Sequence, residues 1–328
     1  MRRLGLEALL VLVVVAALVA GTAFGESHLG LAQYLQALSD PHSGAAEVLW
    51  AIRAPRAATA AVVGGCLGLA GALMQGVLRN PLADPGVLGV SACAGLGAAV
   101  SIVLGMALAP GAVEAAAFVG AAVGGGLLIL FATRFPEPEA LVLFGVALCS
   151  FAGAVTALVF NLSPSPIATA EVLNWLLGSV ENRSWSDVLV TGVPLLIAAG
   201  LSLTTGRALK ALTLGDETAS TLGLDMRRWK IVAILAASLA TGAAVATAGV
   251  VGFVGLAAPH LVRGFVREDP ARLLIPSALA GAAMLAVADL ATRMTPTDQE
   301  LKLGVFTALV GAPLFALLAW RSARSWRR

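Results

Sequence analysis

Residues Ala57–Leu78 read AATAAVVGGCLGLAGALMQGVL and contain no Asp, Glu, Lys or Arg. A helix that crosses the hydrocarbon core of a bilayer needs about 20 consecutive, mainly apolar residues, so this segment is long enough for one span. Similar segments fill most of the 328-residue chain, of which 59% is hydrophobic and 12% is charged, whereas soluble proteins carry about 25% charged residues. We therefore expect an all-α, polytopic integral membrane protein. The composition excludes a soluble enzyme, a disordered chain and a nucleic-acid-binding protein.

The uncharged segments predict about ten transmembrane helices. Ile231–Val262 is too long for one span and contains Gly249, Gly252, Gly255 and Pro259, which disfavour a continuous helix. We therefore expect a full span, a break near the pathway of the protein, and a shorter span. The alternative is one helix that is kinked at Pro259 and whose glycines permit close packing. The other segments are Leu9–Gly25, Val87–Val113, Ala115–Thr133, Ala140–Ala170, Val188–Gly206, Leu273–Ala288 and Leu303–Trp320.

The basic residues predict the orientation of these spans. With an even number of spans both termini lie on one side, and placing that side in the cytoplasm assigns 16 of the 21 Lys and Arg residues to it. Cytoplasmic loops are enriched in these residues. We therefore expect both termini in the cytoplasm, and a first helix that is retained rather than cleaved as a signal peptide. The outer side receives Arg53, Arg56, Arg183, Arg293 and Lys302.

Glycines recur four residues apart within the predicted spans. Helices in lipid associate closely where small residues let their backbones approach, so this spacing predicts a tightly packed multi-helix core. The pairs are Gly21/Gly25, Gly64/Gly68 and Gly120/Gly124.

Few residues suggest chemistry. Neither the cysteines nor the histidines have the spacing of a metal site or a disulfide framework, and no GxxxxGK[ST] loop for ATP is present. We therefore expect no enzyme activity, no cofactor and no metal. Asp289 is the acidic residue deepest in a predicted span, which makes it a functional candidate: an ion-coupled transporter would use it to bind H⁺ or Na⁺. Because Arg293 follows one turn later, the competing interpretation is an ion pair on the helix surface.

The most charged cytoplasmic loop covers about residues 207–228. Within it, Leu214–Gly223 reads LGDETASTLG. Asp216 and Glu217 would lie in the first turn of a short helix, where acidic residues suit the helix dipole, and a glycine closes it. A short, charged helix of this kind could dock on a cytoplasmic partner; the alternative is an ordinary amphipathic loop.

Five motifs occur in order along the chain: RAPR at 53–56, GALMQGVLRNPLADPGVLG at 71–89, WLLGS at 175–179, GFVGLAAPH at 252–260 and LGVFTALVGAP at 303–313. Together they resemble the signature of the FecCD-type permeases, the membrane subunits of ABC importers for iron-siderophores, haem and cobalamin. The resemblance covers about residues 4–321 and makes residues 1–328 a single transmembrane permease domain.

The resemblance implies a homodimer of ten-helix subunits in the lipid of the bacterial inner membrane, with a pathway on its two-fold axis. A cytoplasmic ATPase dimer and a periplasmic substrate-binding protein would complete the importer. The cargo would be an iron chelate or a related chelate such as haem or cobalamin. Two other classes remain open: an ion-coupled secondary transporter that uses Asp289, and a structural or assembly subunit. Genes for an ATPase and a binding protein beside this one would favour the importer over the secondary transporter.

The resemblance also assigns a cytoplasmic coupling site for the ATPase. Glu217-Thr218-Ala219-x-x-x-Gly223 resembles the EAA-x-x-x-G element of ABC importers, although Thr218 replaces the first alanine and the downstream Leu-Pro is missing. The assigned residues are Leu214, Gly215, Asp216, Glu217, Thr218, Ala219 and Gly223.

Two further sites are implied. Arg53, Arg56 and Arg293 correspond to outward arginines that pair with glutamates of the binding protein; the alternative is that they snorkel at span ends. The cytoplasmic gate of the pathway would lie at Asn80, Leu82, Pro138 and Glu139. The cobalamin member of the family has small hydroxyl residues before its fifth span, whereas this chain has Pro136-Glu137-Pro138-Glu139, so the gate departs from that pattern.

Overall fold

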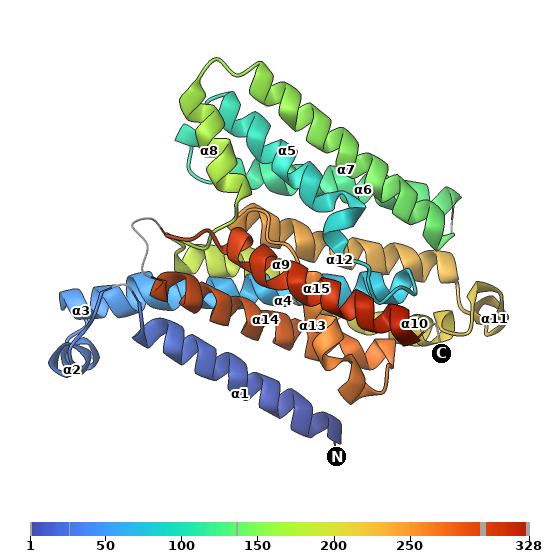
Figure 1. The fold of residues 1–328 in the computed structure, drawn as a ribbon, viewed down its shortest axis with the longest axis horizontal. Helices are drawn as coiled ribbons and strands as arrows, with labels where there is room; N and C mark the ends of the chain where they lie inside the picture. Colours follow the sequence, from blue (N-terminus) through green and yellow to red (C-terminus); the bar gives the residue numbers. More distant parts are fainter. Residues whose placement is uncertain (1, 26, 136, 296–299, 326–328) are drawn as a thin grey trace.

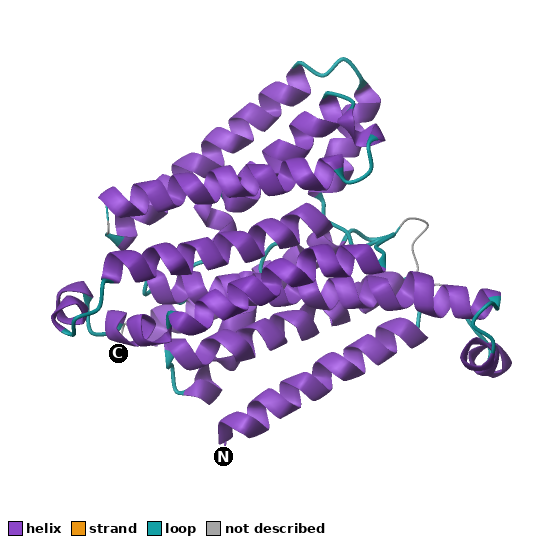
Figure 2. Ribbon diagram, turned by 180° about the vertical axis from the view of Figure 1, so that it is seen from behind, coloured by secondary structure: helices purple, strands orange, loops and turns teal. Residues whose placement is uncertain are grey.

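The computed structural model describes residues 2–25, 27–135, 137–295 and 300–325. These residues form helices joined by loops and turns, and no strand occurs among them (Figures 1 and 2). The predicted all-α class is therefore confirmed for the described part of the chain.

Among the described residues, seven helical segments are long and apolar enough to cross a membrane. They lie in α1 (Arg2–Ala23), in the continuous run of α3 (Gly44–Ala46), the π-helix η1 (Glu47–Arg53) and α4 (Ala54–Val77), and in α6 (Ala112–Arg134), α7 (Pro138–Asn161), α9 (Trp185–Thr204), α12 (Met226–Ala248) and α14 (Pro270–Met294). Three shorter apolar helices are α5 (Val90–Val103), α13 (Val254–Arg263) continued by η4 (Gly264–Val266), and the first part of α15 (Leu303–Ser325). Length and composition thus support seven spans, and the expected count of about ten requires the shorter helices to cross as well.

The connecting elements gather at two opposite ends of the bundle. The helix α2 (Leu31–Ser39) lies with α3 at one end, and α10 (Gly206–Leu212) and α11 (Asp216–Thr221) lie at the other (Figure 1). The remaining short elements are η2 (Pro85–Leu88), η3 (Met106–Leu108) and α8 (Pro166–Leu176). The two ends therefore present different short helices to the surroundings of the bundle.

The core of the bundle is built around α4, which is buried along almost its whole length. It packs against α9, α12, α13 and α14. The helix α12 also contacts α6, and thereby joins the central helices to the group formed by α5, α6, α7 and α8 (Figure 1).

Glycines set the spacing between α4 and α14. A Cβ atom built on Gly64 would lie 2.2 Å from the carbonyl oxygen of Gly281, and one on Gly68 would lie 2.2 Å from that of Ser277. Only a residue without a Cβ allows backbones this close. The expected tight packing at the four-residue glycine pair Gly64/Gly68 is therefore confirmed.

The uncharged segment from 231 to 262 is interrupted as expected. The helix α12 ends at Ala248, α13 begins at Val254, and both Gly249 and Phe253 have positive φ values, 70° and 68°. Pro259 lies inside α13, so the break precedes it and the alternative of a single helix kinked at Pro259 is wrong. Ser179 N donates a hydrogen bond of 2.8 Å to the carbonyl oxygen of Ala248. The interrupted backbone is thus covered by protein, which is the condition for irregular backbone at membrane depth.

Candidate functional site

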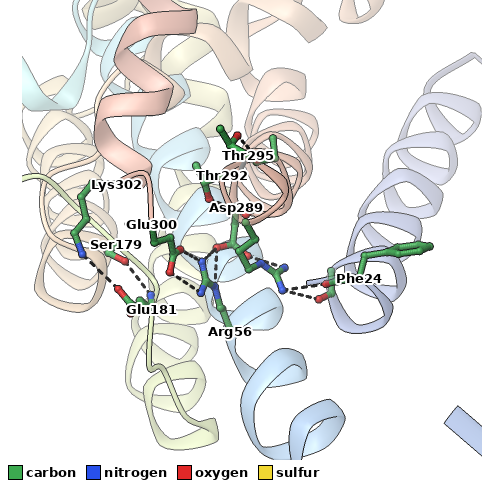
Figure 3. A network of polar contacts seen from close by, with 12 residues as sticks. Phe24, Arg56, Ser179, Glu181, Asp289, Thr292, Thr295, Glu300 and Lys302 are labelled. Carbon is green, nitrogen blue, oxygen red and sulfur yellow. Dashed lines mark hydrogen bonds and ion pairs between the residues drawn. The ribbon is translucent and has the colours of Figure 1, made fainter. Parts of the chain in front are cut away.

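A buried cluster of charges joins three separate elements at the end of the bundle that carries α2 and α3. Arg56 comes from the start of α4, Asp289 and Arg293 from the end of α14, and Glu300 from the non-helical segment before α15 (Figure 3). The Asp289 side chain is only 1% exposed and lies between the two arginines. Arg56 Nε donates to Asp289 Oδ1 at 2.9 Å, and Arg293 Nη2 lies 2.9 Å from Asp289 Oδ2.

The other face of Arg56 is occupied by Glu300. Arg56 Nη1 donates to Glu300 Oε2 at 3.1 Å, and Nη2 donates to Oε1. Two parallel hydrogen bonds between a guanidinium and a carboxylate give both strength and a fixed geometry. Arg56 is therefore held between a deep carboxylate on α14 and a second carboxylate nearer the surface.

Backbone carbonyls at the end of α1 accept hydrogen bonds from Arg293 and from Arg53, the last residue of η1, which extends the cluster. Arg293 Nη1 donates to the carbonyl oxygens of Gly21 and Phe24, at 3.0 and 3.2 Å. Arg53 Nη1 donates to that of Ala23 at 2.6 Å, and its Nη2 donates to Ser27 Oγ at 3.0 Å. The two arginines thereby connect the end of α1 to η1 and α14.

The charged side chains of this cluster are arranged differently from what the sequence suggested. The pair between Asp289 and Arg293 exists four residues apart on α14, but it is buried rather than on the helix surface, because Arg56 from another helix completes it. The guanidinium groups of Arg53, Arg56 and Arg293 are buried and directed toward acceptors of this chain. The sequence does not reveal this, since the partners of Arg56 lie more than 200 residues away along the chain.

The remaining basic residues expected on the outer side lie at the same end. Lys302 Nζ is 3.3 Å from Glu181 Oε2 (Figure 3). Arg183 Nη1 lies 3.1 Å from Glu114 Oε1, and the neighbouring Trp185 donates to the carbonyl oxygen of Trp50, close to Arg53. The structure thus brings together all five basic residues that the charge distribution assigned to one side.

The short helix predicted in the loop at about residues 207–228 is present at the opposite end of the bundle. The short helix α11 lies between Gly215 and Gly223, whose φ values of 95° and 75° are the left-handed conformations that favour glycine. Ala219 is buried, whereas Leu214 and Thr218 are exposed; the side chains of Asp216 and Glu217 lie outside the described part of the structure. Leu222, which sequence reasoning did not select, is also an exposed apolar side chain beside α11.

The residues assigned to the gate fall in two places. Asn80 Oδ1 accepts a hydrogen bond of 2.9 Å from Leu82 N in the turn after α4, and Leu82 lines a small cavity with Phe253 and Leu256, near α15. Pro138 and Glu139 begin α7 and do not line that cavity, and Pro136 lies outside the described residues. The cavity at Leu82 therefore joins the turn after α4 to the helix break, a proximity that the sequence did not indicate.

Comparison with known proteins identifies the family. Residues 9–321 match the model of the FecCD transport family, and the chain belongs to that family. It is 39% identical over 260 residues to the cobalamin import system permease protein BtuC of Halobacterium salinarum, covering 79% of this chain and 69% of that protein. It is 38% identical over 258 residues to the Fe(3+)-citrate import system permease protein YfmD of Bacillus subtilis, covering 78% and 76%.

A solved inward-facing structure of a metal-chelate type ABC transporter has the same fold. It superimposes with a TM-score of 0.84 at 28% identity and covers 97% of this chain and 98% of that one. The chain is therefore a multi-pass, membrane-spanning permease component of an ABC transporter rather than its catalytic subunit. Within the family, its relatives are named for the import of cobalamin, Fe(3+)-citrate and hemin.

Proposed function

We propose that this chain forms the homodimeric permease of a binding-protein-dependent ABC importer that carries an iron chelate across the bacterial inner membrane. The observation that carries the proposal is the position of two candidate docking elements at opposite ends of the bundle: α11 at one end and the arginine cluster at the other (Figure 1). An importer of this kind needs a cytoplasmic contact for its ATPase dimer and an external contact for its binding protein.

The proposed topology has about ten spans and cytoplasmic termini. Its support is the set of three shorter apolar helices beside the seven long ones, together with the five basic residues at the end opposite α11. Labelling of single cysteines with a membrane-impermeant maleimide tests it. Leu31→Cys, on exposed α2, should react in intact cells, and Leu214→Cys should react only after permeabilisation. The reverse pattern would overturn the orientation.

The proposed contact with the ATPase is made by α11 and its flanking residues. Exposed Leu214, Thr218 and Leu222 surround buried Ala219, which is the composition of a small docking surface: apolar side chains for burial on a rigid, short helix. Asp216, Glu217, Gly215 and Gly223 belong to the same proposal. Cross-linking of Thr218→Cys to cysteines introduced on the ATPase subunit tests the contact, and cross-links only at the opposite end of the permease would refute it.

The proposed contact with the binding protein is made by Arg53, Arg56 and Arg293. These side chains are buried against acceptors of this chain, so a partner must compete for them. The positive charge gathered at this end would still accelerate the encounter with an acidic partner and make it dependent on salt. Arg56→Glu should slow association, and reversal of a glutamate on the partner should restore part of the rate. Unchanged association rates and salt dependence after reversal of all three charges would refute the contact.

The proposed cargo is an iron chelate, which its relative YfmD is named for. Titration of ferric citrate, a hydroxamate siderophore, haem and cobalamin against the binding protein encoded with this permease tests the choice. The gate is proposed at Asn80, Leu82, Pro138 and Glu139, and the contact of Leu82 with the cavity at Phe253 supports the part that follows α4. Tight binding of cobalamin or haem alone would replace the iron chelate.

The ion-coupled alternative receives less support. A carboxylate that couples transport to an ion must bind and release that ion in each cycle, whereas Asp289 is paired with both Arg56 and Arg293 at 2.9 Å. These ion pairs favour a structural role for Asp289 in the importer.

A further inference from the structure

Arg56 is held by two carboxylates that differ in depth and in backbone. Asp289 is 1% exposed, belongs to the long helix α14 and also pairs with Arg293. The Glu300 side chain is 13% exposed and belongs to the non-helical segment that precedes α15. Of the two carboxylates, Glu300 is thus the one that can leave Arg56 without movement of a membrane helix (Figure 3).

Glu300 binds the two Nη groups of Arg56, which an external carboxylate would also need. Arg56 Nη1 and Nη2 each donate to a different oxygen of Glu300. Asp289 Oδ1 accepts from Nε and also lies 2.9 Å from Nη2, so Asp289 shares only one arm of the fork. The two Nη groups form the fork by which a guanidinium binds a carboxylate in bidentate fashion. Two carboxylates in one fork would repel each other, so a partner can engage Arg56 in this way only when Glu300 has left.

We propose that Glu300 occupies the binding-protein site of this permease: it closes the Arg56 fork in the free protein and is displaced by a carboxylate of the docking partner. Asp289 stays in place and keeps the guanidinium oriented during this exchange. The proposal rests on the docking function proposed above for Arg56. The exchange also has a physical advantage after the partner is released, because return of Glu300 prevents Arg56 from remaining as a buried cation without its second counter-ion.

The partner can bind the fork only in those molecules in which Glu300 has left it. The apparent affinity of the partner is therefore reduced in proportion to the fraction of molecules with an open fork. For an ion pair near the protein surface this reduction is roughly two- to fivefold. Glu300→Gln should therefore tighten binding of the partner by that factor, because the amide no longer competes as a charged ligand for the fork.

The test uses the complete permease–ATPase complex in nanodiscs and the binding protein encoded with it. The matched control is Glu181→Gln, which removes an acidic charge from the same end but pairs with Lys302 rather than with a docking arginine. We expect Glu300→Gln to tighten binding at both low and high salt, and Glu181→Gln to change it less than about twofold once salt screens long-range charge. Equal effects of the two variants would overturn the proposal.

A double variant separates this proposal from the docking function. In an Arg56→Gln background, Glu300→Gln should no longer change the affinity, because residues that act through one contact are not additive. If Arg56→Gln weakens binding but Glu300→Gln does not tighten it, the role of Glu300 is refuted while docking at Arg56 stands. If Arg56→Gln has no effect on binding, the docking function itself is refuted.

A measurement without the partner checks the closed fork directly. Phenylglyoxal modifies accessible arginines, and mass spectrometry of the peptides gives the rate at each site. Glu300→Gln should increase the modification rate of Arg56 and leave that of Arg183, which pairs with Glu114, unchanged. An unchanged rate at Arg56 would show that Glu300 does not cover the fork, and would overturn the proposal.

Discussion

Replacement of Asp289 by asparagine should strongly destabilise the permease. The carboxylate is 1% exposed and lies 2.9 Å from nitrogens of both Arg56 and Arg293. Without its charge, Arg293 retains the neutral carbonyl oxygens of Gly21 and Phe24, and Arg56 retains Glu300. Removal of one partner from a buried ion pair costs about 3–5 kcal/mol, because a buried charge is left uncompensated. We expect Asp289→Asn to lose about that much stability.

The assay is equilibrium unfolding of the purified permease in one detergent, with Glu114→Gln as the control. The Glu114→Gln variant also loses a carboxylate that pairs with an arginine, since Glu114 lies 3.1 Å from Arg183. The Glu114 side chain, however, is 32% exposed. A pair in contact with solvent contributes about 0–1 kcal/mol, so the control should unfold almost as the unmodified protein does.

A second variant tests the cause of the loss. Asp289→Asn combined with Arg293→Met should recover part of the stability, because the second change removes the buried cation that the first change left without its counter-ion. Loss of less than about 1 kcal/mol in Asp289→Asn, equal to that in Glu114→Gln, would refute the view that this cluster is a buried, coupled unit.

Three further predictions concern packing, coupling and the helix break. Gly64→Ala should lower the stability of the permease by about 1–3 kcal/mol, because the new Cβ would overlap the Gly281 backbone. The control is Gly200→Ala in α9, where no atom lies within 4 Å of the new Cβ; it should be neutral or slightly stabilising in the same unfolding assay. Equal losses of stability in the two variants would contradict the close crossing of α4 and α14. Ala219→Trp should uncouple ATP hydrolysis from uptake in proteoliposomes while the subunits remain assembled, and fully coupled uptake would count against the α11 contact. Cysteine scanning across residues 250–261 should find water-accessible positions whose labelling changes with ATP, and a uniformly unreactive stretch would contradict a break beside the pathway.

Local features of the fold could be predicted from the sequence because their causes are local. The interruption after α12 follows from Gly249 and its neighbours, and the short helix α11 follows from acidic residues at its start and glycines at both ends. The uncharged segment from Val87 to Val113 gave a span that was too long, since Gly105 and Gly111 adopt φ values of 73° and 77° and end α5 early. Absence of charge indicates lipid or protein surroundings, but it does not fix where a helix ends.

The arginine cluster could be predicted only in part because its partners are distant in the sequence. Arg293 lies four residues after Asp289, so that pair is visible as a helical spacing. The contacts of Arg56 with Asp289 and Glu300 join residues 233 and 244 positions apart, and only the crossing of α4 and α14 brings them together. The charge distribution placed these arginines on one side of the membrane, and they lie together at one end of the bundle, but the inward direction of the side chains depends on this tertiary contact.

The source of energy for uptake most directly tests whether this chain is the permease of an ABC importer. Proteoliposomes that contain this chain and its ATPase subunit, with substrate-loaded binding protein outside, ATP inside and ionophores that remove all ion gradients, provide the measurement. We expect the labelled iron chelate to accumulate only when ATP, the binding protein and the ATPase subunit are present together. Accumulation driven by an imposed H⁺ or Na⁺ gradient in the absence of ATP would contradict it and would assign the protein to the ion-coupled class.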